Sequence, residues 1–318
     1  MKSKLDQLRE MTVVVADSGD MEAIRTWKPV DCTTNPTLLL KAIASPALHA
    51  ILEDAVAWGR KQSGDRQQVI GRIADRLTID IGTELTKIVP GRVSTEVDAT
   101  LSFDLQGSIQ KARDIIAAYE SRGVPRERIL IKLASTWEGI QAARVLQKES
   151  IDCNMTLLFS LVQAMASADA GVFLISPFVG RILDWHVKNE GRKFTPEEDP
   201  GVHSVRSIYA AYKSRGIKSI VMGASFRSAG EVEQLAGCDR LTISPAIMEE
   251  LSKDTGTLAR RLSPENFGEV PPIPNVDEKS FRWLMNEDAM ATEKLSEGIR
   301  VFAADLRKLH QFISEQLK

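Results

Sequence analysis

The chain has 318 residues, 43% of them hydrophobic and 26% charged, which is ordinary for a soluble globular protein and allows one large α/β barrel or two domains. The 41 lysines and arginines nearly balance the 43 acidic residues, so the net charge of −2 gives no bulk attraction to nucleic acid or to an anionic membrane. The cysteines are widely spaced without a CxxC pair, which argues against a disulfide framework or a zinc knuckle and favours a reducing cytosol; they are Cys32, Cys153 and Cys238.

Neither a secretory signal nor a membrane-spanning segment is expected. The first ten residues contain no apolar signal core. The most apolar window, residues 156–179, is interrupted by Gln163, Asp169, Gly171 and Pro177, and its pattern indicates a strand, a helix and a strand inside a core.

Short apolar runs alternate with helical patterns along most of the chain. Eight runs have the length and residue types of buried parallel strands: residues 12–16, 31–35, 93–99, 128–136, 153–159, 172–179, 219–225 and 240–245. Helical patterns cover residues 37–61, 65–89, 104–122, 137–149, 204–215 and 228–236. This alternation predicts a (β/α)8 TIM barrel. A doubly wound open sheet is the main alternative, but no Gly-x-Gly-x-x-Gly follows a strand and there is no P-loop.

The residues beyond a minimal barrel lie in an extra early helix, a polar loop at residues 188–203, and the tail after residue 253. Residues 263–279 are rich in proline and charge, which predicts a surface loop. Residues 277–318 return to helical periodicity. We therefore expect one barrel domain over residues 1–318, with additional C-terminal helices packed on it.

The run at residues 128–136 holds a single lysine, Lys132, among apolar residues. An ammonium on such a strand must be paired, solvated in a pocket, or neutral. A neutral amine there could attack a carbonyl substrate and form a Schiff base. A structural lysine that reaches solvent or a salt bridge at the strand's end is the alternative, and the strand by itself favours neither.

Polar side chains occur late in nearly every predicted strand, where barrel enzymes carry their chemistry. They are Asp17, Thr33, Asn35, Glu96, Lys132, Asn154, Thr156, Ser176 and Ser225. Any one of them could simply cap the next helix. So many in the same relative place predict a polar pocket with one amine, two carboxylates and several neutral hydrogen-bonding groups.

These residue types suit carbonyl chemistry. Iminium formation needs a neutral amine, a group that moves protons, and a water held in place. Glu96 could move the protons with Thr156 orienting the water, and Asp17 is the spare carboxylate that could act as a base in carbon–carbon cleavage. A salt bridge to Lys132 or to an arginine is the alternative for both carboxylates, and Asp98 is a weaker candidate.

Two arginines, Arg181 and Arg227, come just after the sixth and seventh strands. Late strands of a barrel often build a phosphate site, and the arginine fork matches phosphate oxygens. Ser225 could add a hydroxyl, whereas a surface salt bridge is the alternative for each arginine. A metal site is not expected, because the four histidines are scattered without an HxH or HExxH pair.

Six segments, taken in order, closely resemble the transaldolase family: residues 15–20, 33–36, 94–98, 129–137, 153–157 and 175–181. The resemblance implies a (β/α)8 barrel, a cytosolic homodimer, no cofactor, and sugar phosphates as substrates. It also implies transfer of a dihydroxyacetone unit from sedoheptulose 7-phosphate to glyceraldehyde 3-phosphate, giving erythrose 4-phosphate and fructose 6-phosphate.

The resemblance also implies a role for each matching residue. Lys132 matches the Schiff-base lysine, Glu96 and Thr156 match the groups that hold the catalytic water, and Asp17 matches the acid/base for bond cleavage. The residues that match the surroundings of the dihydroxyacetone unit are Thr33, Asn35, Asn154 and Ser176, and those that match the phosphate site are Arg181, Ser225 and Arg227.

Two other functions remain open at this point. A simple class I aldolase on the same scaffold would release free dihydroxyacetone, and a release assay without an acceptor would distinguish it. A catalytically silent sugar-phosphate-binding protein is the second alternative, but it would not need Asp17, Glu96 and Lys132 together.

Overall fold

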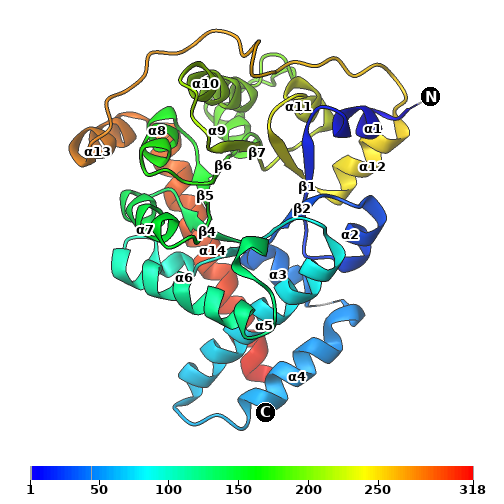
Figure 1. Cartoon of the computed structure of the whole chain (residues 1–318), viewed down its shortest axis with the longest axis vertical. Helices are drawn as coiled ribbons and strands as arrows, with labels where there is room; N and C mark the ends of the chain where they lie inside the picture. Colours follow the sequence, from blue (N-terminus) through cyan, green and yellow to red (C-terminus); the bar gives the residue numbers. More distant parts are fainter. Residues whose placement is uncertain (1, 44, 318) are drawn as a thin grey trace.

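A computed structural model describes residues 2–43 and 45–317 of the chain, and it is a closed barrel of eight parallel strands (Figure 1). The strands follow one another around the barrel in chain order, and β8 closes it by pairing with β1. They are β1 (Val13–Asp17), β2 (Asp31–Thr33), β3 (Val93–Glu96), β4 (Ile129–Ala134), β5 (Cys153–Leu158), β6 (Leu174–Pro177), β7 (Ile220–Gly223) and β8 (Arg240–Ile243). The predicted (β/α)8 barrel is confirmed, and all eight strands lie within or next to their predicted runs.

The barrel interior has its own apolar layer. Val15, Leu130, Leu174 and Met222 come from β1, β4, β6 and β7, yet they form one buried cluster separate from the main core. Side chains two residues apart on a strand share a face. The residues two positions later therefore also point inward, and this places Asp17, Lys132 and Ser176 directly above the apolar layer.

Helices surround the barrel. They are α1 (Lys4–Arg9), α2 (Met21–Trp27), α3 (Pro36–Ala42), α4 (His49–Gly59), α5 (Arg66–Ile88), α6 (Leu105–Glu120), α7 (Trp137–Lys148), α8 (Leu161–Asp169), α9 (Gly180–Glu190), α10 (Pro200–Ser214), α11 (Ala229–Gln234), α12 (Pro245–Lys253), α13 (Glu278–Glu287) and α14 (Ala289–Gln316). Most begin at an Asp, Asn, Ser or Thr whose side chain accepts a backbone N–H of the first turn, as Asp65 does for α5. Together with the apolar face of each helix, these caps fix where the helices start.

One predicted helix and one predicted loop were wrong in detail. The helix expected over residues 37–61 is divided into α3, a 3-10 turn (Pro46–Leu48) and α4, because Pro46 cannot donate the backbone hydrogen bond that would continue a helix. The polar loop expected over residues 188–203 is shorter, since α9 ends at Glu190 and α10 already begins at Pro200.

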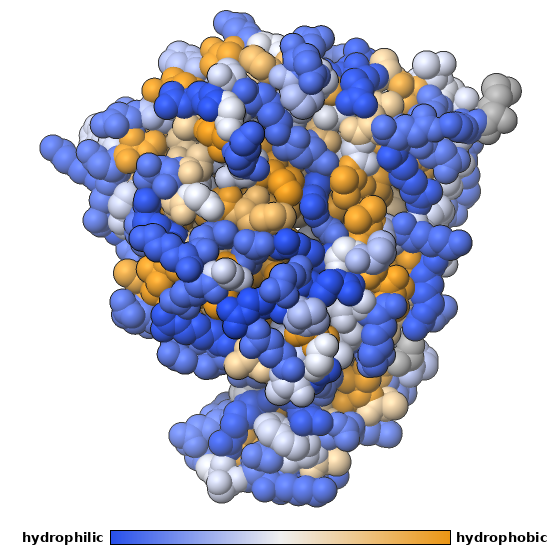
Figure 2. Space-filling model, in the orientation of Figure 1, coloured by the Kyte–Doolittle hydropathy of each residue, from blue (hydrophilic) through white to orange (hydrophobic). Residues whose placement is uncertain are grey.

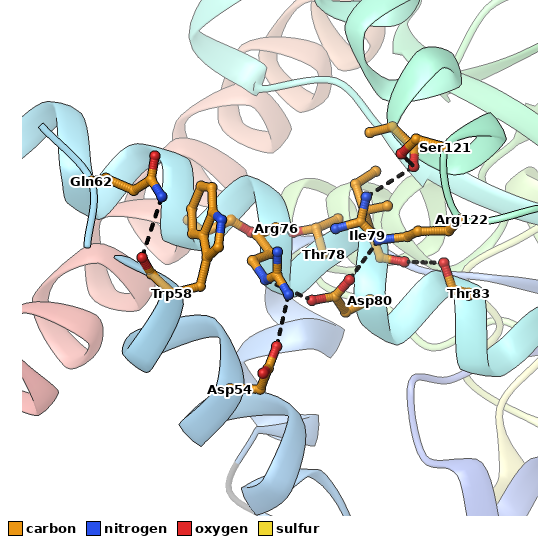
Figure 3. Close-up of polar contacts among 12 residues, drawn as sticks. Asp54, Trp58, Gln62, Arg76, Thr78, Ile79, Asp80, Thr83, Ser121 and Arg122 are labelled. Carbon is orange, nitrogen blue, oxygen red and sulfur yellow. Dashed lines mark hydrogen bonds and ion pairs between the residues drawn. The ribbon is translucent and has the colours of Figure 1, made fainter. Parts of the chain in front are cut away.

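Helices α4 and α5 extend away from the barrel at the lower end of Figure 1. Arg76 of α5 holds the two helices together: it pairs with Asp54 at 2.7 Å and Asp80 at 3.3 Å, and its guanidinium lies 5.0 Å from the Trp58 ring (Figure 3). Arg122, just after α6, pairs with the same Asp80 at 2.6 Å. One chain of charges therefore links α4, α5 and the end of α6.

The C-terminal helix α14 packs against α3, α5, α9 and β5, so it lies along the same side of the barrel as several earlier elements (Figure 1). An extended segment follows α12, where the sequence predicted a loop, and it leads to α13 and then to α14. Hydrophilic residues dominate the face shown in Figure 2, and hydrophobic residues form separate patches. No helix in the described part of the chain is long and apolar enough to cross a membrane.

Candidate active site

The strand register brings the predicted polar residues together at one end of the barrel. Asp17 is level with Thr33, and Glu96 is level with Lys132, which in turn is level with Asn154. Eight of the eleven predicted site residues line a single cavity: Asp17, Thr33, Asn35, Lys132, Thr156, Ser176, Arg181 and Ser225. The other three, Glu96, Asn154 and Arg227, each contact a residue of that cavity.

Lys132 lies deep in the site. Its Nζ is 3.2 Å from Glu96 Oε2 and donates a hydrogen bond to the backbone oxygen of Thr34 at 3.3 Å. The side chains of Lys132 and Glu96 are only 6% and 5% exposed. The amine therefore has one carboxylate partner and lines a cavity. Of the states that the sequence allowed for this lysine, the structure has the one in which it is paired and lies in a pocket.

Burial raises the pKa of both acids in the site. For Glu96 and Asp17, loss of water outweighs the opposing attraction of the Lys132 amine. Each carboxyl group thus holds a proton more readily than in water while remaining next to a cation. A carboxyl group whose pKa is raised by burial beside a cation is suited to accept and return a proton during a reaction.

Asp17 is held by a short chain of hydroxyl groups. Thr33 Oγ1 donates to Asp17 Oδ1 at 3.1 Å and lies 3.0 Å from Thr242 Oγ1. Thr242 lines the cavity from β8, and the sequence analysis did not select it. The sequence did indicate it, because Thr242 is a polar residue between the apolar Leu241 and Ile243 of the predicted strand.

The amide and hydroxyl residues divide into fixed and free groups. Asn154 Nδ2 donates to Ser94 Oγ at 3.1 Å, and its Oδ1 accepts from Ser176 at 2.6 Å. Asn35 Oδ1 caps α3 by accepting the Leu38 N–H at 2.9 Å. In contrast, Thr156 Oγ1 is buried without a hydrogen-bond partner among the described residues. That hydroxyl is suited to hold a water or a substrate oxygen.

Arg181 lies between two aromatic rings. Its guanidinium is 5.0 Å from the Phe178 ring and 5.3 Å from the Phe302 ring of α14. Burial and the nearby Arg227 lower the pKa of Arg181. Since two guanidinium groups repel each other, an anion bound between them would be stabilised. Phe302 was not selected from the sequence, because its helical pattern predicts only a core position.

Arg227 is more exposed. It pairs with Asp184 of α9 at 2.7 Å, and its Nη1 lies 3.4 Å from Ser225 Oγ. Ser225 adopts φ +63, a conformation that costs a non-glycine residue free energy and is frequent at functional sites. Asp98 serves a different purpose: it caps the 3-10 turn Ala99–Leu101 by accepting the Thr100 N–H at 2.8 Å.

A group of three or more His, Cys, Asp or Glu side chains arranged to hold a metal ion does not occur in the part of the chain that the structure describes. Burial raises the pKa of the Cys32 and Cys238 thiols to about 12, so both are protonated at neutral pH.

Comparison with known proteins agrees with this geometry. Residues 14–313 match the family described as transaldolase/fructose-6-phosphate aldolase. A protein named transaldolase from Rhizobium etli is 65% identical over 318 residues, covering 100% of this chain and 99% of the relative. Proteins of the same name from Agrobacterium fabrum and a Marinomonas species are 64% and 58% identical, over 98% and 100% of their own lengths. The chain belongs to the transaldolase/fructose-6-phosphate aldolase family.

Proposed function

We propose that the protein is a transaldolase that moves a dihydroxyacetone unit from sedoheptulose 7-phosphate to glyceraldehyde 3-phosphate through a Schiff base on Lys132. The observation that carries this proposal is the buried Lys132 amine, 3.2 Å from Glu96 Oε2, in a cavity that Asp17 and Arg181 also line. The names of the relatives agree with it.

The reaction begins when the Lys132 ammonium passes a proton to Glu96 and the resulting neutral amine attacks the C2 carbonyl of the ketose. Glu96 transfers protons so that the carbinolamine loses water and becomes an iminium ion, and the free Thr156 hydroxyl holds that water. Asp17 takes the proton of the C4 hydroxyl, the C3–C4 bond breaks, and erythrose 4-phosphate leaves. The three carbons that remain form an enamine on Lys132.

The second half reverses these steps on another aldehyde. The enamine carbon attacks glyceraldehyde 3-phosphate, and Asp17 returns its proton to the new hydroxyl group. Water held at Glu96 and Thr156 then hydrolyses the iminium ion, which releases fructose 6-phosphate and frees the amine. Every proton taken from a substrate is returned, so the cycle needs no cofactor.

The neutral polar residues position the substrate. Thr33, Asn35 and Ser176 line the cavity together with Lys132, and Asn154 is level with Lys132 and accepts a hydrogen bond from Ser176. The hydroxyl groups of the dihydroxyacetone unit would lie among these side chains. Arg181, Ser225 and Arg227 are contributed by the segments after β6 and β7, where they would bind the phosphate at the other end of the sugar.

Borohydride trapping tests the proposal. Reduction in the presence of fructose 6-phosphate should add a dihydroxyacetone or hexose unit to the peptide that contains Lys132, as read by peptide mass. Lys132→Ala should give no adduct, with Lys87→Ala, an exposed lysine of α5, as the matched control. An adduct that persists in Lys132→Ala would refute the assignment.

We also propose that residues 1–318 form a single domain that works as a homodimer in the cytosol. The resemblance to the family supports this, and buried, protonated cysteines are compatible with a reducing compartment. Light scattering coupled to gel filtration would measure the mass: a value near the 35.1 kDa of one chain would contradict the dimer.

A further inference from the structure

Two acidic side chains are buried next to the proposed phosphate site. Glu231 of α11 and Asp199, the N-cap residue of α10, are 1% and 2% exposed. Their carboxyl groups lie within hydrogen-bonding range of each other. Two carboxylates at such a short distance repel each other, so the pair is stable only when one of them carries a proton.

Glu231 is tied to the loop that carries the phosphate-binding residues. Its Oε2 accepts the backbone N–H of Arg227 at 2.5 Å and that of Ser228 at 3.3 Å. Its Oε1 is buried and receives no hydrogen bond from the described N–H and O–H groups. A proton on Glu231, donated to Asp199, would satisfy both acids.

Asp199 is tied to the other side of the same site. Its Oδ1 accepts the backbone N–H groups of Gly201 and Val202 at 2.7 and 3.2 Å. The α10 turn packs directly on Val179, since a Cβ added to Gly201 would lie 2.2 Å from the Val179 oxygen. The residue after Val179, Gly180, donates its N–H to the Ser225 oxygen at 2.7 Å. The two acids therefore lie between the segments that carry Arg181 and Arg227.

The charged groups around the pair do not neutralise it. His203 of α10 faces Asp199, and the Arg227 guanidinium is engaged by Asp184 of α9. Other charged groups near α10 and α11 have partners of their own: Arg206 of α10 and Glu197 both bind Gln234, and Lys4 of α1 pairs with Glu233. No lysine or arginine forms an ion pair with either acid among the described residues. No such cation can therefore take the place of the shared proton in stabilising the two acids.

We propose that the Asp199–Glu231 pair positions the loop from Ser225 to Ser228, and that loss of its shared proton weakens binding of the substrate's phosphate group. Glu231 is then a positioning residue that acts through Arg227 and Ser225. This inference rests on the phosphate role assigned above to those two residues. Ionisation would place two charges face to face and push Glu231 away from the backbone it holds.

The expected signal is a pH-dependent KM. Burial beside Asp199 raises the pKa of Glu231 to about 7. If only the protonated pair holds the loop, the competent fraction one pH unit above that value is about one tenth, and the KM for fructose 6-phosphate rises about tenfold. The phosphate group of the substrate titrates near pH 6 whichever variant is used. Its effect on KM therefore cancels when the variants are compared at the same pH.

The test measures KM for fructose 6-phosphate, with erythrose 4-phosphate as the acceptor, from pH 6 to pH 9. Glu231→Gln keeps the shape, the acceptor oxygen and a donor to Asp199, but cannot ionise. Its KM should therefore change less than twofold from pH 7 to pH 9, where the substrate phosphate is already a dianion. Glu233→Gln, on the same helix but paired with Lys4, should follow the wild type. A flat wild-type profile, or an equally steep one in Glu231→Gln, would overturn the proposal.

A second measurement does not need turnover. The infrared difference spectrum between the resting wild type and Glu231→Gln should contain the carbonyl stretch of a protonated carboxyl group at pH 6 and lose it at pH 8.5. If the band appears but fructose 6-phosphate is not a substrate, the protonated Asp199–Glu231 pair is supported and the proposed function is refuted. Absence of the band at pH 6 refutes the pair. Should Glu231→Gln not fold, Asp199→Asn, which keeps the capping oxygen, must abolish both the band and the steep KM.

Discussion

The Lys132 amine lies 3.2 Å from the Glu96 carboxylate on the neighbouring strand, and the two residues are level in the register of β3 and β4. A substrate carbonyl that reacts with the amine removes the cation that Glu96 faces. Burial already raises the pKa of Glu96 against that attraction, so the carboxylate becomes a stronger base when the amine becomes a carbinolamine. In the proposed mechanism, this pair would couple Schiff-base formation to proton transfer.

Replacing Glu96 by Gln should slow turnover by about 10²–10⁴-fold, the usual contribution of one general acid–base group. The amide keeps the size of the side chain but cannot carry a proton to and from the carbinolamine. Stopped-flow trapping with borohydride should show the adduct forming at a correspondingly lower rate. An unchanged rate of adduct formation would remove Glu96 from this step.

Asp17→Asn should separate the two chemical steps. The Schiff base can still form because Lys132 and Glu96 are intact, but the C4 hydroxyl has no base and the C3–C4 bond stays closed. We expect borohydride to trap the intact six-carbon sugar on Lys132, with transfer reduced by at least about 10²-fold. A three-carbon adduct at the wild-type rate would contradict the role of Asp17.

Arg227→Ala should raise the KM for fructose 6-phosphate about 10–100-fold, which corresponds to the loss of one charge-assisted hydrogen bond worth about 1.5–3 kcal/mol. Its kcat/KM for unphosphorylated fructose should change little. The exposed Arg192, which pairs with Glu190, provides the control as Arg192→Ala. Equal losses on both sugars would exclude a phosphate role.

An assay without acceptor distinguishes transfer from simple cleavage, because the family description covers both transaldolases and fructose-6-phosphate aldolases. We expect release of free dihydroxyacetone from fructose 6-phosphate to be at least about 10²-fold slower than transfer to erythrose 4-phosphate. Equal rates would make the protein an aldolase and would leave the Lys132 chemistry unchanged.

Stability should fall as the pH rises from about 4.5 to about 7. The pKa of Glu231 is raised in the folded protein to about 7 from 4.5, so the folded state binds a proton more tightly than the unfolded chain does. The stabilisation from this proton is complete below the unfolded value and is lost through the folded one, on the order of 3 kcal/mol. Urea unfolding at several pH values should show a smaller slope for Glu231→Gln, and an identical slope would contradict the shift.

Arg76→Ala should destabilise the α4–α5 pair without affecting the active site. It removes the ion pairs with Asp54 and Asp80 and the contact with the Trp58 ring shown in Figure 3, together about 1–2 kcal/mol. Urea unfolding measures the loss, and Lys87→Ala, which breaks only one exposed pair with Glu84, should cost far less. Unchanged stability would show that solvent screens the whole network.

Much of the site follows from a period of two along each strand. Asp17 comes two residues after the apolar Val15, and Lys132 comes two residues after the apolar Leu130. Because residues two apart on a strand share a face, the polar residue of each strand points into the barrel as the apolar one does. Chain order and apolar runs were sufficient to identify these strands. The division of the early helix at Pro46 also has a local cause, although the surrounding apolar pattern obscured it.

The contributions of distant elements could not be predicted in the same way. Phe302 is 1% exposed, as its helical pattern predicts, but only the packing of α14 brings it to Arg181. The Asp199–Glu231 contact joins a helix N-cap to a capping-box residue on another helix. The sequence explains each acid separately as a residue that caps its own helix, so nothing in it indicates that the two side chains meet.

Helix α14 supplies a wall of the cavity, yet the chain reaches it only after all eight strands. Without α14, the Arg181 guanidinium would keep the Phe178 ring and lose the Phe302 ring. Any displacement of α14 from the barrel would therefore expose Arg181 on the side of the cavity that Phe302 lines.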